Sequence, residues 1–490
     1  MNNNILSGLE PKSVFNYFEQ ICSIPHGSGN TKQISDFCVS FAKEHNLKYL
    51  QDNSNNIIIW KAGTTGYENS PSVIIQGHLD MVCEKEHDCD INFEKDGLSL
   101  IVYGDNIHAD RTTLGGDDGI AIAFALAILD STDISHPPIE AVFTVDEEIG
   151  MLGAVSLDCS PLKSRIMLNL DSEDEGSLLV SCAGGVTTTA HLPLTFEKTD
   201  GLLAEITISG LTGGHSGTEI NKDRANSNRL MGRTLYSLSK NYDFRLVNIN
   251  GGLKDNAIPN KTVATLILTD RKHKDNFVDD ISKLNNTYKH EYALTDSSVS
   301  LETSFSDNIL SNEIANKIMT KDSTSKVITA LVNLPGGVHR MSHDIEGLVQ
   351  TSLNMGILKT TETEMQASFS IRSSIHSEKN MLMDMISCLT ETLGGYITNC
   401  GEYPAWEFKK TSHLRDIMSE VFEEQYGYKP SIDALHAGVE CGIFSEKLPG
   451  LDCVSFGPTI YDIHTSKERI SIESVQRTWK YTLEVLKRLK

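Results

Sequence analysis

The hydrophobic pattern of the first 186 residues contains two kinds of segment, amphipathic helices and short apolar strands. Apolar side chains recur at helical spacing in two segments, residues 14–24 and residues 31–45. Four short runs are apolar without alternation, as central strands buried on both faces are: residues 56–60, 72–76, 141–145 and 165–170. Residues 119–129 are apolar on every side, which predicts a helix inside the fold. Strands alternating with helices predict an α/β fold, with three layers around a central mixed sheet.

The pattern changes near residue 187 and changes back near residue 396. Between these points, alternating strands such as residues 187–194 and 203–208 are separated by long polar helices, which predicts a second, α+β domain. The first pattern then returns in three segments, residues 412–425, 453–456 and 474–489. We therefore expect one catalytic domain made of residues 1–186 and 397–490, with residues 187–396 inserted into it.

Composition and charge narrow the class of protein. The 490 residues exceed one ordinary core, and no run of 18 apolar residues is present to span a bilayer. The formal net charge of −23 disfavours nucleic acid and anionic membranes as partners, because phosphate binding depends on clustered Lys and Arg. The ten cysteines contain no Cys-x-x-Cys pair, and the first residues lack the pattern of a signal peptide. We therefore expect a cytoplasmic globular protein with reduced thiols that binds neither nucleic acid nor membrane.

Two adjacent carboxylates, Glu147 and Glu148, follow the apolar run at residues 141–145. On its own, such a pair is usually a solvated acidic turn. At the end of a strand, however, the chain can bend so that one carboxylate binds a cation while its neighbour stays free to accept a proton. A hydrolytic metal site needs this division of roles.

Other potential ligands follow predicted strands or precede the buried helix: His78, Asp80, Asp117, Asp171 and His464. Each has an ordinary explanation, since a lone His-x-Asp is usually structural, an aspartate before a helix is often a cap, and most of sixteen histidines are not ligands. Because ligand sites gather at the carboxyl ends of strands in open α/β sheets, we expect these side chains to meet. Imidazoles and carboxylates without thiolates suit Zn, Mn or Co. A two-metal hydrolase also needs a bridging carboxylate and a base, and this chain has candidates for both.

Four motifs stand in order along the chain: Gly-His-Leu-Asp-Met-Val at 77–82, Gly-Asp-Asp-Gly at 116–119, Asp-Glu-Glu-Ile-Gly at 146–150 and Gly-Gly-His-Ser-Gly at 213–217. In this order they resemble the family of co-catalytic di-zinc exopeptidases that includes aminoacylases, glutamate-releasing carboxypeptidases and bacterial dipeptidases. The chain length, together with residues 436–442 and 455–459, is similar to the aminoacyl-histidine dipeptidase branch of that family. The likeness covers essentially the whole chain.

The resemblance implies roles for the candidate residues. Two divalent cations, Zn with Co or Mn as alternatives, would be held by five side chains, with the aspartate at 117 shared: His78, Asp117, Glu148, Asp171 and His464. Glu147 would be the general base, and Asp80 would support the ligand at 78 from behind. His215 would stabilise the tetrahedral oxyanion. The substrate would be bound by Arg372, through its carboxylate, and by Asn226 and Asn256.

Two positions refine this picture. Asp118 stands where the branch usually has asparagine, and we expect it behind the metal ligands rather than among them. An aspartate at 171, where carboxypeptidase-like members tend to carry glutamate, favours the aminopeptidase and dipeptidase side of the family.

The resemblance further implies metal-dependent hydrolysis of dipeptides by a metal-activated water, with Xaa-His substrates, including β-alanyl-histidine, foremost. The enzyme would act on small peptides as a homodimer or a monomer, with the insert as a lid domain. A tripeptide aminopeptidase and an N-acyl-amino-acid deacylase are alternatives within the same family. A metal-dependent scaffold protein is disfavoured, because a binding protein has no need of a base such as Glu147 beside its metal ligand.

Overall fold

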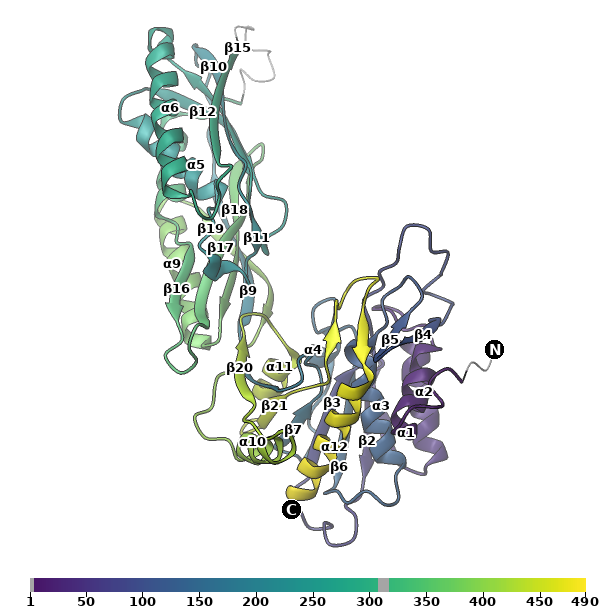
Figure 1. Cartoon of the computed structure of the whole chain (residues 1–490). Coiled ribbons are helices and arrows are strands. Elements are labelled where there is room, and N and C mark those ends of the chain that lie inside the picture. The colour runs from purple at the N-terminus through teal and green to yellow at the C-terminus, as the bar shows by residue number, and fades with distance from the viewer. Residues whose placement is uncertain (1–3, 307–316) are drawn as a thin grey trace. The chain divides into compact units, whose positions relative to one another are not determined.

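The structure, a computed structural model, describes residues 4–306 and 317–490 (Figure 1). The chain divides into two compact units. Unit 1 comprises Met1–Cys182, Phe408–Ala434 and Val439–Lys490. Unit 2 comprises Ala183–Glu407 and Leu435–Gly438. In sequence, most of unit 2 is therefore one long segment between parts of unit 1.

Unit 1 is built on an eight-stranded mixed sheet in the order β1-β2-β6-β3-β7-β21-β8-β20. Its strands are β1 (Lys48–Gln51), β2 (Ile57–Lys61), β3 (Val73–His78), β6 (Ile139–Thr144), β7 (Ile166–Asn169), β8 (Ser177–Cys182), β20 (Ser431–Leu435) and β21 (Asp452–Ser455). The central strands β6, β3, β7 and β21 are parallel, whereas the pairs β1–β2, β2–β6 and β21–β8 are antiparallel. The predicted α/β fold class with a mixed sheet is confirmed.

Helices cover this sheet, and a smaller four-stranded sheet completes unit 1. The helices are α1 (Lys12–Cys22), α2 (Lys32–Glu44), α3 (Gly116–Asp130), α4 (Leu152–Ser156), α10 (His413–Tyr426), α11 (Glu440–Lys447) and α12 (Ile472–Arg488). The smaller sheet contains β4 (Leu100–Tyr103), β5 (Asn106–Ala109), β22 (Ile460–Tyr461) and β23 (Arg469–Ser471). Helix α2 packs on β1 and β2, and α10 and α11 pack on β21.

Helix α3 lies inside unit 1, as its sequence predicts. Its residues are buried from Gly116 to Leu129, and it packs against both β3 and α1. Phe124 meets the ring of Trp479 edge-on at 5.2 Å between ring centroids. Because each large apolar side chain buried in this way contributes about 1.5 to 3 kcal/mol, α3 is held firmly, and its first residues include Asp117.

The parallel strands explain where polar side chains collect. In a parallel set, all carboxyl ends lie along one edge of the sheet. Strand β3 ends at His78, β6 runs into the turn that carries the adjacent glutamates, and β7 is followed by Asp171. The topology thus brings residues that are far apart in sequence to one edge of unit 1.

Unit 2 contains a nine-stranded sheet whose paired strands are antiparallel. Its order is β15-β10-β14-β12-β17-β18-β9-β19, with β16 also paired to β17. The strands are β9 (Gly184–Pro193), β10 (Leu202–Ser209), β12 (Phe244–Gly251), β14 (Thr262–Leu268), β15 (Ser300–Ser306), β16 (Gly337–Met341), β17 (Val349–Thr360), β18 (Glu364–Ser373) and β19 (Tyr396–Tyr403). A separate two-stranded ribbon joins β11 (Gly214–His215) to β13 (Ala257–Ile258).

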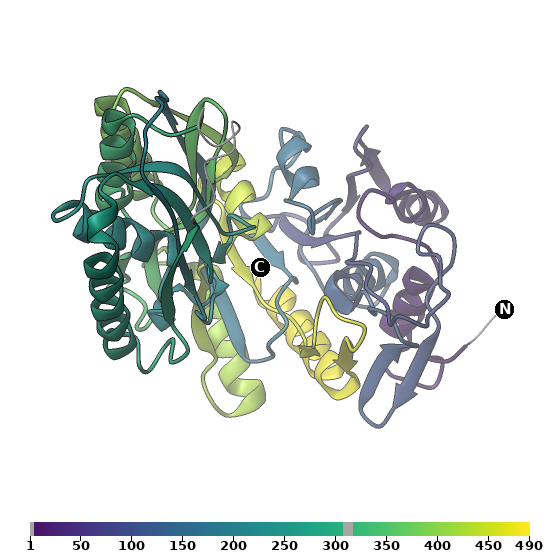
Figure 2. The same cartoon turned by 90° about the horizontal axis from the view of Figure 1, so that it is seen from above.

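Long helices cover one face of this second sheet, as Figures 1 and 2 show within unit 2. They are α5 (Ser227–Ser239), α6 (Lys274–Glu291), α8 (Lys321–Asn333) and α9 (His376–Thr392), with short 3-10 turns η1 (Ile220–Lys222) and η2 (Arg271–His273). In β10, buried and partly exposed residues alternate, so that one face of the strand packs into the core under the helices. Unit 2 therefore has an antiparallel α+β architecture of its own.

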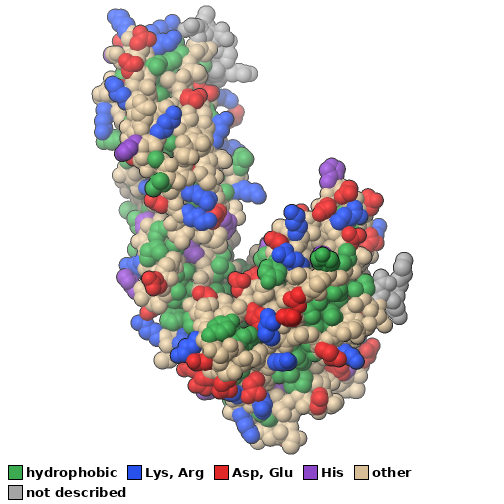
Figure 3. Space-filling model, in the orientation of Figure 1, with side chains coloured by type: hydrophobic (Ala, Val, Ile, Leu, Met, Phe, Trp, Pro, Cys, Tyr) green, Lys and Arg blue, Asp and Glu red, His purple; other side chains and the backbone are tan. Residues whose placement is uncertain are grey.

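Surface and cysteine features complete the description. The ten cysteines are thiols outside any disulfide bond, and seven of them are buried. Acidic and basic side chains are interspersed on the face drawn in Figure 3. Within residues 4–306 and 317–490, no helix is long and apolar enough to cross a membrane.

Candidate metal centre and active site

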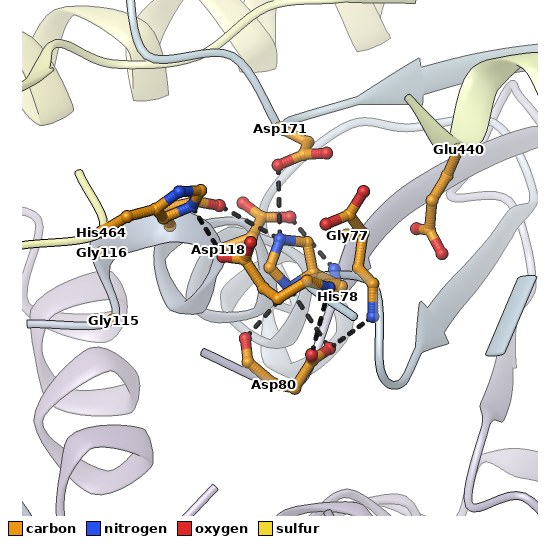
Figure 4. A network of polar contacts seen from close by, with 12 residues as sticks. Gly77, His78, Asp80, Gly115, Gly116, Asp118, Asp171, Glu440 and His464 are labelled. Atoms are coloured by element: carbon orange, nitrogen blue, oxygen red, sulfur yellow. Dashed lines mark hydrogen bonds and ion pairs between the residues drawn. The ribbon is translucent and has the colours of Figure 1, made fainter. Parts of the chain in front are cut away.

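Seven of the residues predicted for the site lie together in unit 1, at the carboxyl edge of the parallel strands. They are His78, Asp80, Asp117, Glu147, Glu148, Asp171 and His464. They come from β3, the start of α3, the turns after β6 and β7, and the loop between β22 and β23. Figure 4 shows this cluster from close by.

His78 faces two aspartates. Its Nε2 atom lies 3.1 Å from Asp117 Oδ1 and 3.4 Å from Asp171 Oδ1, and the imidazole is almost completely buried. Its Nδ1 atom lies 3.0 Å from the backbone carbonyl oxygen of Asp80. A neutral imidazole with its proton on Nδ1 would donate to that carbonyl, which leaves the Nε2 lone pair facing the two carboxylates.

His464 approaches the same aspartate from the other side. Its Nε2 atom lies 3.1 Å from Asp117 Oδ2 and 3.0 Å from Glu148 Oε1. The backbone of His464 has a φ of +59°, in the left-handed region, so the loop is bent sharply where it presents this ring. The carboxylate at 117 thus lies between two imidazoles, one oxygen facing each.

Asp80 has more contacts than its sequence motif predicts. One oxygen lies 3.5 Å from Nδ1 of His78 and accepts a hydrogen bond from the backbone N–H of Glu147 at 3.0 Å. The other oxygen accepts from the hydroxyl of Ser28 at 2.8 Å and from the N–H of Glu148 at 3.4 Å. Asp80 therefore fixes the turn that carries both glutamates, besides lying behind the imidazole.

Asp118 belongs to the cluster. Its Oδ2 atom accepts a hydrogen bond from the backbone N–H of His78 at 3.1 Å, and the side chain is 1% exposed. One of its oxygens also lies within 4.8 Å of ligand atoms of His78 and Asp171. The position we expected behind the ligands is therefore within reach of a cation held by those two residues.

The protonation behaviour of the cluster reflects its crowding. Burial raises the pKa of Glu147, with Asp171, Glu440 and Glu148 adding to the rise, and burial raises the pKa of Asp171 to about 6. Hydrogen bonds to the acids at 117 and 148 raise the pKa of the His464 imidazole to about 10. The carboxylates therefore attract positive charge strongly. When no cation is bound, they take up protons instead.

The donor set suits divalent cations. Three groups of side chains each bring three ligand atoms within 4.8 Å of one another: His78, Asp118 and Asp171; His78, Glu147 and Glu148; and Asp117, Glu148 and His464. These groups contain five carboxylates and two imidazoles, so bound cations would take the place of the protons that the carboxylates otherwise attract. Imidazole nitrogen and carboxylate oxygen without thiolate are ligands that Zn, Mn and Co accept.

The remaining predicted residues lie in unit 2. His215 ends strand β11, and its Nδ1 atom accepts hydrogen bonds from the backbone N–H groups of Gly217 at 3.3 Å and Thr218 at 3.2 Å. Burial, with Arg372 nearby, lowers the pKa of His215, which keeps the ring neutral near pH 7. With Nδ1 occupied as an acceptor, the ring proton is on Nε2, which is then a hydrogen-bond donor.

Arg372 on β18 lies near this histidine, and its guanidinium has one group that is hydrogen-bonded and one that is not, among the described residues. Its Nη1 atom donates to the hydroxyl of Tyr403 at 2.8 Å. Its Nε atom is buried with no hydrogen-bond partner among the described residues, and the same holds for Ser216 Oγ and His436 Nδ1. A Cβ atom added at Gly217 would lie 3.2 Å from Arg372 Nε and 2.8 Å from the carbonyl oxygen of His436, so the three segments pack closely. Arg372 Nε and Ser216 Oγ are donors, and buried donors of this kind indicate a place for an oxygen-rich ligand.

The two predicted asparagines differ in their surroundings. Asn256 lies next to the β11–β13 ribbon, where its backbone carbonyl accepts from the N–H of Ser216 at 2.8 Å. Asn226 is the N-cap of α5, and its side-chain oxygen accepts from the N–H groups of Asn228 and Arg229. Its amide donates to Asn354 and to the carbonyl of Met355. The Asn226 side chain is thus engaged in holding the backbone.

Three polar residues near these clusters were not among the predicted site residues. Glu440 accepts hydrogen bonds from the side chains of Gln76 at 2.5 Å and Thr144 at 2.6 Å. Burial raises the pKa of its carboxyl to about 8. His436 is buried and lies 2.7 Å from Ser352 Oγ, and burial lowers its pKa to about 3. Both stand in residues 436–442, a segment that the sequence singles out without assigning roles. Glu468 has no signal of its own in the sequence.

Comparisons with known proteins agree with this geometry. The model of Peptidase family M20/M25/M40 matches residues 74–488. The cytosol non-specific dipeptidase of Escherichia coli (strain K12) is 36% identical over 490 residues, covering 99% of this chain and 99% of the relative. The crystal structure of aminoacylhistidine dipeptidase from Vibrio alginolyticus is 36% identical, with a TM-score of 0.92, and covers 98% of this chain and 97% of the other.

A more distant structure shares the fold. The aminopeptidase PepT from Bacillus cereus is 14% identical, with a TM-score of 0.56, over 98% of this chain and 99% of the other. The resemblance that the four sequence motifs indicate is confirmed by the family match and by the two relatives at 36% identity. The chain therefore belongs to peptidase family M20/M25/M40, and it is a peptide hydrolase.

Proposed function

We propose that the protein is a metal-dependent dipeptidase, with Xaa-His dipeptides, β-alanyl-histidine included, among its substrates and a wider range of dipeptides beside them. The observation that carries the proposal is the position of Asp117 between two imidazoles, with Glu147 beside them. The names of the two relatives at 36% identity, a non-specific dipeptidase and an aminoacylhistidine dipeptidase, support the choice of substrate.

Two divalent ions, Zn with Co or Mn as alternatives, complete the proposed site. His78, Asp117 and Asp171 would hold one ion, and Asp117, Glu148 and His464 the other. Asp118 is a further candidate beside the first group. When bound, such ions supply Lewis-acid polarisation of the scissile carbonyl.

Glu147 is the proposed general base. It would take a proton from the attacking water and pass it to the leaving amine. Two features support this role: burial and neighbouring acids raise the pKa of its carboxyl, and Asp80 holds its backbone N–H at 3.0 Å. The hydrogen bond from the backbone N–H of Glu147 to Asp80 fixes the turn that carries this carboxyl, and a raised pKa favours proton transfer near neutral pH.

Unit 2 is proposed to bind the ends of the substrate that do not react. The partnerless Nε of Arg372 suits a C-terminal carboxylate, which a guanidinium can bind through two hydrogen bonds. The Ser216 hydroxyl offers a further donor, and His436 Nδ1 is a further buried polar atom among the described residues without a hydrogen-bond partner. His215, neutral and protonated on Nε2, would donate to the oxyanion that develops on the carbonyl. Asn256, next to the β11–β13 ribbon, is proposed as a further substrate contact.

The proposal also includes the domain boundaries predicted from the sequence. Residues 1–186 with 397–490 would form the catalytic domain, and residues 187–396 the lid domain that binds substrate. A cytoplasmic location is proposed from the name of the Escherichia coli relative. The enzyme would act as a homodimer or a monomer, which size-exclusion chromatography with light scattering distinguishes.

The experiment that tests the proposal is hydrolysis of a peptide panel after chelation and re-addition of Zn, Mn or Co. The panel contains Ala-His, β-Ala-His, Leu-Gly, Ala-Ala-Ala and acetyl-Met. Metal-restored cleavage of the dipeptides, Xaa-His foremost, is the expected result. Preferential cleavage of Ala-Ala-Ala would instead make the protein a tripeptide aminopeptidase, and cleavage of acetyl-Met alone would make it a deacylase. Tight metal binding without any cleavage would overturn the enzymatic reading.

A further inference from the structure

Glu468 is a buried carboxylate that four backbone N–H groups approach. Its side chain is 3% exposed. One oxygen accepts from Leu114 at 2.8 Å and Gly115 at 3.2 Å. The other accepts from Gly116 at 2.8 Å and Asp117 at 3.3 Å. All four donors belong to consecutive residues at the start of α3, of which Figure 4 labels Gly115 and Gly116.

The backbone of this segment is shaped around the carboxylate. Gly115 has a φ of +65°, in the left-handed region, and this turn makes successive N–H groups point the same way, as in an anion-binding nest. A Cβ atom at Gly116 would lie 3.3 Å from the nearer oxygen of Glu468, so the acid lies close against the main chain. Gly115 is also the N-cap of α3 and has no side chain that could satisfy these donors.

The same glutamate belongs to the loop that carries His464. Its backbone N–H donates to the carbonyl of Thr465 at 3.1 Å, which closes a turn immediately after that histidine. The next residue, Arg469, begins β23 and pairs with His108 on β5. One side chain therefore ties the segment that presents Asp117 to the loop that presents His464, and these two ligand candidates lie 3.1 Å apart.

The choice of residue is informative, because helix starts are usually capped by a local Ser, Thr, Asn or Asp. Here the cap comes from a residue 351 to 354 positions away in the sequence, and it places another carboxylate near the already crowded acids. A local cap would satisfy the helix, but it would not connect the two ligand-bearing segments.

We propose that Glu468 is a positioning residue, which holds the Asp117 carboxylate in register with His464 so that both act on the same metal ion. This inference rests on the proposed function, since it requires that the cluster binds metal. Glu468 acts through the backbone of residues 114–117, and no contact with substrate is involved.

The test compares Glu468→Gln with the wild-type chain and with the control Glu473→Gln. Glutamine keeps the size of the side chain but has one acceptor oxygen, so two of the four N–H groups lose their acceptor. Glu473 is 72% exposed on α12, five residues further along, and its substitution changes charge without touching the loop. The readouts are the affinities for Zn²⁺ and Co²⁺ in competition with a chelator, the absorption spectrum of the cobalt-loaded protein, and kcat and KM for a dipeptide.

Glu468→Gln is expected to bind one of the two ions about 10- to 100-fold more weakly, which is the usual cost of losing a residue that orients a metal ligand. The cobalt spectrum should change for that ion, and kcat should fall while KM stays within about twofold. Glu468→Asp, which keeps two acceptor oxygens on a shorter side chain, should lose less affinity than the glutamine variant. Glu473→Gln should match the wild type in every readout.

Several results would overturn the inference. Unchanged metal affinity in Glu468→Gln, even with a lower unfolding temperature, would show that the residue merely caps a helix. Failure of both Glu468 variants to fold would show that the carboxylate holds the fold rather than the ligand register. If the wild-type chain itself binds no metal, the proposed function fails, and this inference fails with it. Two ions bound equally by wild type and variant would overturn this inference alone.

Discussion

Asp117 Oδ2 lies 3.1 Å from Nε2 of His464, although 347 residues separate the two in the sequence. The contact forms because α3 is buried against β3 and the loop after β22 returns to the same edge of the sheet. The other oxygen of Asp117 lies 3.1 Å from His78 Nε2. This arrangement supports the proposed role of Asp117 as the residue that would be shared by two cations.

Metal removal is predicted to destabilise the protein. Without cations, the carboxylates at the edge of unit 1 repel one another in a largely buried setting. At a free ion concentration roughly 100 to 1,000 times the dissociation constant, binding stabilises the folded state by about 3 to 4 kcal/mol. Chelation should therefore lower the unfolding temperature measured by calorimetry. Addition of Zn²⁺ should restore it. Identical unfolding curves with and without the chelator would contradict a metal centre here.

Arg372→Ala is predicted to weaken binding of dipeptides that have a free C-terminus. Loss of a charged hydrogen bond costs about 1.5 to 3 kcal/mol, which corresponds to a rise in KM of about 10- to 100-fold with kcat little changed. A dipeptide amide, which has no carboxylate, should be cleaved equally by variant and wild type. The measurement is steady-state kinetics on both substrates.

Arg340→Ala provides the matched control for this substitution. Arg340 is an arginine of unit 2 that is half-exposed and paired with Glu378. Its loss removes one positive charge from the same unit without changing the group around His215. If both arginine variants raise KM by the same factor, the effect is one of overall charge and the assignment of Arg372 is wrong.

The ion pair between Glu175 and Arg477 predicts a pH-dependent contribution to stability. Glu175 accepts from Arg477 Nε at 2.8 Å and Nη2 at 2.7 Å, and from the hydroxyl of Tyr426 at 2.7 Å. Burial raises the pKa of this carboxyl, but these hydrogen bonds outweigh burial and lower it below the ordinary value of 4.5. The stabilisation is therefore fully present above pH 4.5 and is lost as the pH falls through the lowered pKa.

Glu175→Gln should lower the free energy of unfolding by about 1 kcal/mol at pH 7, a figure reduced for the partial exposure of Arg477. The difference from wild type should shrink as the pH falls below 4.5. Urea unfolding between pH 7 and pH 4 measures it. Glu473→Gln removes the weaker, exposed partner of the same arginine, at 3.4 Å, and should change stability little. An effect of Glu175→Gln that does not depend on pH would rule out the ion pair as its source.

The elements that surround the site were predictable because buried helices and strands have continuous apolar runs in the sequence. The run at 119–129 is apolar on all sides, and it forms the interior part of α3. The runs at 72–76 and 141–145 lack alternation, and they form the central strands β3 and β6. Because parallel strands end along one edge, the ligand candidates that follow them could be expected to meet.

The contacts that fix the candidate ligands were not predictable, because they join loops through backbone atoms. Nothing in the sequence near Glu468 indicates that it accepts from four N–H groups more than 350 residues away. The hydrogen bonds from the backbone of Glu147 and Glu148 to Asp80 likewise cannot be predicted from a sequence motif. The N-cap position of Asn226 at the start of α5 did not enter the sequence analysis, although an asparagine directly before a helix is a common N-cap.

In the proposed mechanism, Glu147 moves the proton while its neighbour Glu148 holds a metal ion. The most direct measurement compares Glu147→Gln with Glu148→Gln, in metal content and in kcat for Ala-His. We predict that Glu147→Gln keeps both ions and loses about 10²- to 10⁴-fold in kcat, the range expected for a general base, whereas Glu148→Gln loses an ion. Activity of Glu147→Gln within about tenfold of wild type, or a loss of metal equal to that of Glu148→Gln, would show that Glu147 is not the general base.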